Sequence, residues 1–292
     1  MRKSLLIATS AALLLIAAAP RKDWKDVEEA LGRAGSVQAG DVYKVSFPRA
    51  DLTVIADGVS IKPASALGSW AAFKDDGNGQ AMAMGDLVLL ESEITPVIDA
   101  LQKGGIEQSA LHNHLAGESP HVMYLHFSGH GDAAKLARTL HDALALTKTP
   151  MGPAPAPPAN PTVDLPTADL DRTLHASGKI AGGTYQFAVP RAEKIVEHGM
   201  EIPPSMGMAT AINFQPTGNG RAAVTGDFVM IGAEVNPVIR ALRGGGIAVT
   251  ALHSHMLDET PRLFFMHFWA NDDAVKLATT LRRALDAMNV KK

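Results

Sequence analysis

Residues 111–127 read LHNHLAGESPHVMYLHF, and residues 252–268 read LHSHMLDETPRLFFMHF, so one segment occurs almost unchanged twice. The offset between the copies is 141 residues (252 minus 111), and it also relates the Gly-Asp pair at 85–86 to the pair at 226–227. Solenoid repeats have periods of roughly 20–50 residues. The much longer spacing here predicts one domain that has been duplicated.

The histidines of this segment follow the alternation of a β-strand. Successive side chains of a strand point to opposite faces, so His112 and His114 share one face. If residue 112 pairs near residue 124 of the returning strand, His126 falls on the same face, whereas a slip of one residue moves it to the other face. We expect the more apolar side chains of the returning strand to face helices, and these are Met123, Leu125 and Phe127 in the first copy.

The surrounding pattern predicts helices and strands in the same order in each copy. In the first copy we expect an opening helix from Trp24 to Ala34, strands within 41–61, a strand over 85–94, a helix from Thr95 to Lys103, the hairpin over 107–128 and a closing helix from Asp132. The predicted fold class is α+β, with two tandem homologous domains. Each would be a mainly antiparallel sheet with helices on one face, built on a β-α-β-β-α core with extra strands.

Composition divides the chain into four segments. Residues 1–19 are typical of a signal peptide, because two positive charges precede an apolar run that ends in alanines. Residues 149–168 contain seven prolines, which favours an extended, semi-rigid linker. The two repeat domains are then expected at residues 20–148 and 169–292.

Charge and cysteine content exclude several classes of protein. The formal charge of the 292 residues is −3 and no basic run is present, which argues against nucleic-acid binding. No cysteine occurs, so disulfides, thiolate ligands and a cysteine nucleophile are excluded. The apolar run of the leader is shorter than the roughly 20 residues of a membrane helix. We therefore expect a periplasmic or secreted protein with no transmembrane domain beyond the signal segment.

The histidines and nearby acidic residues form the candidate site. A His-x-His pair, an acid four residues later and a third histidine suit a divalent transition metal such as zinc or copper. The same histidines also suit a structural polar network or direct contact with an organic ligand, and no catalytic residue is assigned. The candidate metal or ligand residues are His112, His114, Glu118, His126, His253, His255, Glu259 and His267, with Asp86, Glu93, Asp227 and Glu234 as supporting carboxylates.

Differences between the copies identify residues outside the shared pattern. His121 corresponds to Arg262 and His130 to Asn271, so neither histidine belongs to what both copies share, although either could make the first copy the working one. The paired methionines at 82 and 84, and at 206 and 208, also have unlike counterparts. Methionines of this kind are better explained as gap-filling core residues than as copper ligands.

Residues 85–144 resemble the repeat of the LppY/LpqO family of exported bacterial proteins. The elements that carry the resemblance are GD, EI-P, LHNH, E-P, LHF and G-GD, and the likeness extends over most of the chain after the leader. The second copy differs at Ser254, where the first has Asn113, and at the G-GD turn, and the lipidation cysteine of the lipoprotein members is missing. The resemblance implies export and duplication, and it supplies no reaction because the family is functionally uncharacterised.

Three functions are compatible with these residues. The leading one is an exported binding or interaction protein, with a possible histidine and glutamate site for a metal or small ligand in each repeat or between them, where the histidine-bearing sheets would pack together. An envelope ligand is a further possible partner. The second is a metal-dependent hydrolase of the cell envelope with Glu118 as the base. The third is a structural envelope protein without a small-molecule site. The first two require the imidazoles of the two copies to point into one hollow.

Overall fold

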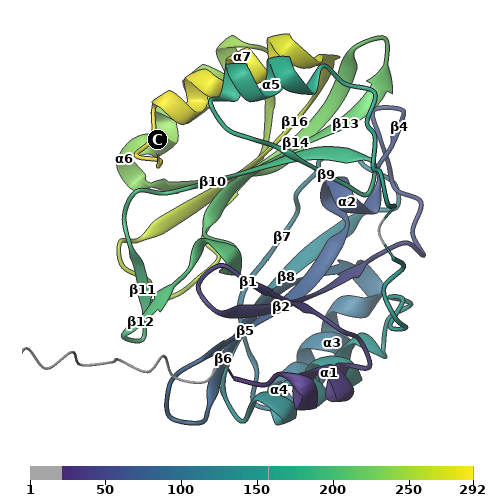
Figure 1. Ribbon diagram of the computed structural model, residues 1–292, viewed down its shortest axis with the longest axis vertical. Helices are drawn as coiled ribbons and strands as arrows, with labels where there is room; N and C mark the ends of the chain where they lie inside the picture. Colours follow the sequence, from purple (N-terminus) through teal and green to yellow (C-terminus); the bar gives the residue numbers. More distant parts are fainter. Residues whose placement is uncertain (1–21, 157, 292) are drawn as a thin grey trace, which may run out of the picture.

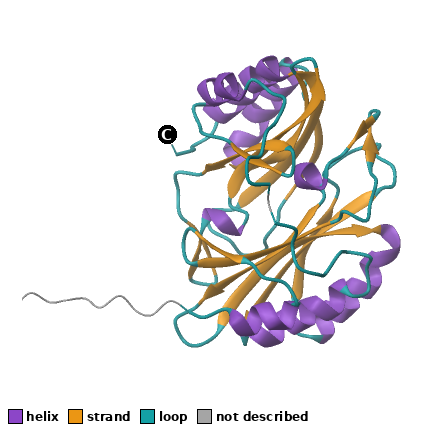
Figure 2. Ribbon diagram, turned by 45° about the vertical axis from the view of Figure 1, so that its right-hand side comes forward, coloured by secondary structure: helices purple, strands orange, loops and turns teal. Residues whose placement is uncertain are grey.

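The structure, a computed structural model, describes residues 22–156 and 158–291. These residues form two six-stranded sheets that face each other, and helices cover the outer face of each sheet (Figures 1 and 2). The molecule is therefore layered as helix, sheet, sheet, helix. This arrangement confirms the predicted α+β class with two tandem domains, each with helices on one face of an antiparallel sheet.

The first sheet has the strand order β1-β2-β5-β6-β8-β7, and all neighbouring strands are antiparallel. Leu125 and Phe127 of β8 pack with α4 in one core cluster, on the face predicted from their alternation. The strands are β1 (Ser36–Gln38), β2 (Val42–Pro48), β5 (Gly68–Asp75), β6 (Ala81–Leu90), β7 (Glu107–His112) and β8 (Val122–Gly131), and the helices are α1 (Lys25–Leu31), α3 (Glu91–Lys103) and α4 (Ala133–Leu144).

The second sheet repeats this topology in the order β9-β10-β13-β14-β16-β15, with its own helices on the outside (Figure 1). The apolar residues of α7 occupy its core cluster together with Met266 and Phe268 of β16. The strands are β9 (Lys179–Ala181), β10 (Thr184–Pro190), β13 (Ala209–Gly218), β14 (Arg221–Ile231), β15 (Ala248–His253) and β16 (Leu263–Asp273), and the helices are α5 (Thr167–Leu174), α6 (Gly232–Gly244) and α7 (Ala274–Asp286).

Each domain also extends a short hairpin and a helical turn toward the other domain. Asn213 Nδ2 of the second domain donates a hydrogen bond to the carbonyl of Ser65 at 2.8 Å. In the opposite direction, Lys44 Nζ of the first domain donates to the carbonyl of Ser205 at 3.2 Å. The extensions are β3 (Ile55–Ala56), β4 (Val59–Ser60) and α2 (Pro63–Ala66) in the first domain, and β11 (Ile195–Glu197), β12 (Met200–Ile202) and the 3-10 turn η1 (Pro204–Met206) in the second.

Two further apolar clusters include residues from both domains. The cluster around Phe265 contains the four methionines at 82, 84, 206 and 208, all buried among aliphatic side chains. The cluster around Tyr124 contains Trp269 of the second domain and no methionine. The methionines thus lie in an apolar environment that suits gap-filling side chains.

The helix that follows β6 begins earlier than predicted. The structure starts α3 at Glu91, whereas the Thr95-Pro96 pair indicated a start at Thr95, so Pro96 lies inside the helix. The reason is the cap: Glu93 Oε2 accepts a hydrogen bond from the backbone N–H of Leu90 at 2.8 Å, which satisfies a donor at the helix N-terminus.

The predicted signal peptide at 1–19 lies outside the described residues. In the predicted linker, the described residues of 149–166 contain no helix or strand, and α5 follows at Thr167. Across the described chain, no helix combines the length and the apolar composition needed to span a membrane.

Candidate metal centre

The strand register places His112 and His126 on the face of the first domain that meets the second domain, and His114 lies in the loop directly after β7. His112 of β7 pairs with Tyr124 of β8, so His126, two residues farther along β8, shares its face. His126 also pairs with Asp86 on the neighbouring strand β6. The second domain has the same arrangement, in which His253 pairs with Phe265 and His267 pairs with Asp227.

The imidazoles of the two domains stack on one another across the interface. His112 faces His253 with 3.5 Å between ring centroids. His114 faces His267 at 3.8 Å, and His126 faces His255 at 3.7 Å. The six histidines predicted from the two copies therefore form one cluster, arranged with approximate two-fold symmetry, between the sheets.

An aromatic side chain closes each end of the cluster. The ring of Tyr124 stacks on His114 at 3.3 Å, and the ring of Phe265 stacks on His255 at 3.6 Å. Tyr124 Oη donates a hydrogen bond to the carbonyl of Ala66 at 2.6 Å, which fixes the ring. Neither aromatic was selected from the sequence, although the alternation that grouped Tyr124 with His126 was a usable signal.

The Nε2 atoms of all six histidines are buried and have no hydrogen-bond partner within the described residues. One oxygen each of Asp86 and Asp227 is in the same condition. Buried polar atoms in folded proteins are almost always paired, because an unpaired one costs about 1–3 kcal/mol. The concentration of these unpaired polar atoms in one place indicates a ligand-binding site.

Backbone carbonyls determine the tautomer of three of the rings. The Nδ1 atoms lie 3.2 Å from the carbonyl of Asn113 for His112, 3.4 Å from that of Ser254 for His253, and 2.9 Å from that of Gly226 for His267. A carbonyl only accepts, so each Nδ1 must carry the proton. In the neutral ring, Nε2 then presents its lone pair, as in a metal-binding histidine.

The aspartates approach the Nε2 atoms at distances that are too long for hydrogen bonds. Asp86 Oδ2 lies 3.8 Å from His114 Nε2 and 3.7 Å from His126 Nε2, and Asp227 lies 3.8 Å from His255 Nε2 and 4.0 Å from His267 Nε2. Two ligand atoms bound at about 2.1 Å to one ion are about 3.4 Å apart in a tetrahedron and about 4.2 Å apart across an octahedron. The observed spacings fit shared ligation.

The donor atoms fall into two groups. In each group the ligand atoms all lie within 4.8 Å of one another. The first group comes from one domain and consists of His112, His114 and His126. The second combines His253, His255 and His267 with His112, which belongs to both. Asp86 and Asp227 lie beside these groups and, among the described residues, belong to neither.

Burial keeps the cluster uncharged at neutral pH. Desolvation, with the neighbouring His253, lowers the pKa of His112 to about 3, and desolvation lowers that of His253 to about 4. The pKa values of the other four histidines fall well below the usual value for the same reason. Desolvation raises the pKa of Asp86 to about 8 and that of Asp227 well above its usual value. The neutral imidazoles are the form that binds metals.

Glu118 and Glu259 lie in the loop that follows the His-x-His pair, and neither joins the donor groups of the described residues. Glu118 Oε1 accepts a hydrogen bond from the backbone of Val122 and lies 2.8 Å from His121 Nδ1. Glu259 accepts from the backbone of Leu263 and from Arg262. The carboxylates of both glutamates therefore stabilise the loops in which they lie.

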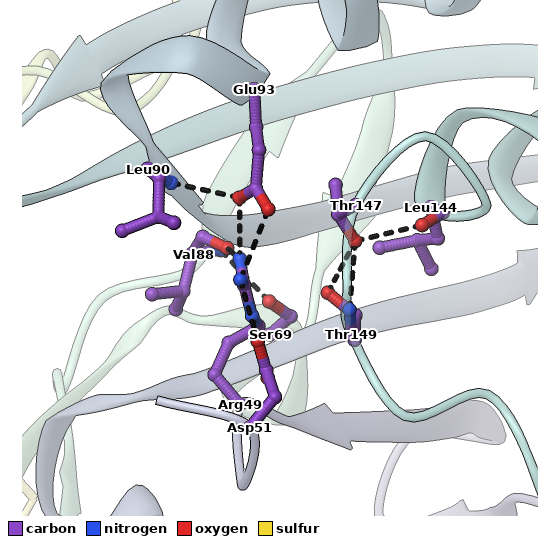
Figure 3. A network of polar contacts seen from close by, with 9 residues as sticks. All are labelled: Arg49, Asp51, Ser69, Val88, Leu90, Glu93, Leu144, Thr147 and Thr149. Atoms are coloured by element: carbon purple, nitrogen blue, oxygen red, sulfur yellow. Dashed lines mark hydrogen bonds and ion pairs between the residues drawn. The ribbon is translucent and has the colours of Figure 1, made fainter. Parts of the chain in front are cut away.

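Glu93 and Glu234 bind buried arginines instead of approaching the histidines. Arg49 is fully buried, and its guanidinium contacts Glu93, Asp51 and the carbonyl of Val88 (Figure 3). Arg191 makes the equivalent contacts with Glu234, Glu193 and the carbonyl of Val229. Arg49 thereby connects the end of β6 to the start of α3, and Arg191 connects the end of β14 to the start of α6.

A cavity of about 410 Å³ reaches the cluster from between the domains. Asp86, Asp227 and four of the histidines line it, as do Lys44 and Trp70 of the first sheet. Lys44 Nζ lies 3.8 Å from the centre of the Trp70 ring. The sequence alone did not single out these two residues, because a lysine within a short strand is commonly exposed to solvent.

Comparisons with known proteins say little about activity. No curated protein matches the chain. Two solved structures are similar: a trimeric bacterial microcompartment shell protein PduB (14% identity, 89% of this chain and 96% of that chain, TM-score 0.22) and EtuB from Clostridium kluyveri (11% identity, 86% and 88%, TM-score 0.22). The family described as Domain of Unknown Function (DUF1259) matches twice, at residues 25–146 and 168–287. The chain therefore belongs to this family and contains its domain in two copies.

Proposed function

We propose that the protein is a metal-binding protein that holds divalent transition-metal ions, zinc or copper, between its two domains. The observation that carries the proposal is the convergence of six buried Nε2 atoms that have no partner among residues 22–156 and 158–291, in two groups that the aspartates flank. Three histidines and one aspartate from each domain would then hold one ion. The ligands would be His112, His114, His126 and Asp86 in one half and His253, His255, His267 and Asp227 in the other.

A structural polar network explains the cluster less well. Such a network needs a donor opposite every acceptor. Here the backbone carbonyls hold the protons of His112, His253 and His267 on Nδ1, so the Nε2 atoms that face the interior are acceptors. Acceptors that face one another in a buried space are unfavourable, and a cation between them removes the conflict.

The donor set favours a transition metal over calcium or magnesium. Neutral imidazole suits zinc, copper, iron and nickel, whereas calcium and magnesium prefer an all-oxygen environment. The absence of cysteine leaves nitrogen and carboxylate oxygen as the main ligands. Zinc with three histidines and one carboxylate would have its usual number of four protein ligands.

Elemental analysis of the untagged chain, loaded with zinc or copper and then dialysed, tests the proposal. We expect about two ions per chain, and about one when His112→Ala is combined with His114→Ala, because both are ligands of the same proposed ion. The matched control combines His130→Ala with His141→Ala, because these side chains are 50% and 42% exposed and lie outside the cluster. Equal metal content in the two double variants would overturn the proposal.

The cavity favours a second candidate function, which is metal-dependent hydrolysis. A hydrolytic metal site needs an open coordination position and access for a substrate, and the cavity borders both aspartates and four histidines. Glu118, the base expected from the sequence, is bound to Val122 and His121 instead. Metal-dependent cleavage of a chromogenic ester or phosphoester, lost on chelation and restored by zinc, would support this candidate, and its absence would favour binding alone.

We also propose that the protein works outside the cytoplasm and is an LppY/LpqO-type protein. The support is the leader-like composition of residues 1–19 and the shared GD, LHNH and LHF elements. Expression of the full chain in a bacterium, followed by cell fractionation and mass measurement, tests this. A shortened chain in the periplasm or medium is expected, and a full-length chain confined to the cytoplasm would contradict the proposal.

A further inference from the structure

We propose that the cavity binds a small anion whose carboxylate or phosphate oxygens lie between Lys44 Nζ and the metal ions. This inference rests on the proposed metal function and specifies the ligand of the same site. The volume of about 410 Å³ is within the range of small-molecule pockets, which is roughly 300–1,000 Å³. A molecule in the cavity can reach both the lysine and the cluster, because both line its wall.

The charges around the loaded cavity favour an anion. Lys44 is the only lysine or arginine that lines the cavity in the described part of the chain, and Asp86 and Asp227 are the only acidic residues. Two divalent ions bring four positive charges, the two aspartates offset two of them, and Lys44 adds one. The excess of positive charge inside the cavity favours an anionic partner, since a buried charge without a partner is costly.

The position of Lys44 allows its ammonium group to bind the proposed anion. Its ammonium group lies over the ring of Trp70 and donates to the carbonyl of Ser205, which is its only hydrogen-bond acceptor in the described residues. An ammonium has three donors, so further donors remain for a ligand. The contacts with Trp70 and Ser205 hold the charge in place before any ligand binds.

The second domain shows that neither Lys44 nor Trp70 is needed for the fold. At the equivalent positions it has Gln186 on β10 and Ala211 on β13. Gln186 Nε2 donates to the carbonyl of Ala64 and leaves no charge there. Ala211 lines the cavity with a single methyl group where the first domain has an indole. The positive charge of Lys44 therefore belongs to the cavity and not to the repeated fold. The small side chain of Ala211 leaves space in the same cavity.

Calorimetric titration of the zinc-loaded chain with inorganic phosphate, and separately with malonate, tests the inference. We expect binding of at least one of the two anions, and the stronger binder identifies the phosphate or the carboxylate class. Lys44→Gln copies the residue of the second domain and should weaken binding roughly 10- to 100-fold, because a hydrogen bond to a charged group is lost. Lys135→Gln, on the exposed face of α4, is the matched control and should bind as the parent does.

Ala211→Trp gives a second test that leaves every charge in place. It copies Trp70 into the opposite wall and should abolish anion binding by filling the cavity, while the zinc content stays unchanged. Retention of parental affinity in Lys44→Gln, or no binding of either anion to the zinc-loaded parent, overturns the anion inference and leaves the metal function standing. A parent chain that binds no metal overturns both.

Discussion

The two domains place three histidines, one aspartate and one buried arginine at equivalent positions, whereas the residues around Lys44 differ between them. Among the equivalent residues, the arginines connect strands to helices, and the histidines form the cluster between the sheets. The differing set lines the cavity, where Lys44 and Trp70 face the smaller wall of the second domain. The scaffold and the histidine and aspartate side chains are thus symmetric, and the cavity wall is one of the places where the two domains differ.

Some differences between the domains leave the local chemistry unchanged. His121 and Arg262 both contact the buried glutamate of their own loop, at 2.8 Å from Glu118 and 3.3 Å from Glu259. A difference between equivalent residues of the two domains is therefore evidence for a special role only when the two side chains also make different contacts. Lys44 meets that condition, because Gln186 binds the backbone of the other domain without adding charge.

The largest effect is expected from removing the buried arginines. Arg49→Ala leaves Glu93 buried without its cation and should lower the free energy of unfolding by about 3–5 kcal/mol. Arg191→Ala should cost about as much, because its contacts match, and urea unfolding measures both. Arg138→Ala on the exposed face of α4 is the control. A loss below about 1 kcal/mol in either domain would contradict the equivalence of the two networks.

Removal of metal should have the next largest effect. Ions held at about 10 times their dissociation constant stabilise the folded state by about 1.4 kcal/mol per site, which is about 3 kcal/mol for two sites. A chelator should therefore lower the thermal unfolding midpoint of the zinc-loaded chain clearly. The His112→Ala variant should lose about half of this difference, since His112 is a ligand of one of the two proposed ions. An equal response of parent and variant to the chelator would break the link between the cluster and stability.

A smaller effect is expected when the first domain is given the aromatic residue of the second. Tyr124→Phe keeps a ring for stacking on His114 and removes the hydrogen bond to the carbonyl of Ala66. The loss should be about 1 kcal/mol, because the buried carbonyl loses its donor. Urea unfolding measures the loss, and elemental analysis should show unchanged metal content. A drop in metal content would mean that the hydroxyl, rather than the ring, supports the cluster.

Strand alternation predicted a shared face for His112 and His114, and added His126 on the condition that residue 112 pairs near residue 124. The strand ends at His112, so His114 reaches the cluster from the following loop. The pairing of residue 112 with 124 and the grouping of Leu125 with the helices both appear in the structure. Such predictions succeed because the side-chain period of a strand is two and each domain has one buried face toward its helices. The repeat offset then extended the result to the second domain without further assumptions.

Other features depend on tertiary contacts, which a local sequence pattern does not predict. The stacking of His112 on His253 requires the relative placement of two sheets, and the cavity is lined by residues of both domains, among them Trp70 and Ala211. Spacing placed Glu118 with the histidines, but its carboxylate is held by the N–H of Val122 in its own loop. The early start of α3 likewise comes from Glu93, whose carboxylate caps the helix.

The smallest effect is expected from exchanging the two partners of the buried glutamates. His121→Arg gives the first domain the residue of the second, and both side chains contact the same carboxylate from a half-exposed position. Exposed ion pairs contribute about 0–1 kcal/mol, so the exchange should change stability by less than about 0.5 kcal/mol and leave the metal content unchanged. His121→Ala provides the comparison in urea unfolding and elemental analysis. If His121→Arg abolished metal or anion binding, His121 would be a working residue of the first domain, and the equivalence of the two loops would fail.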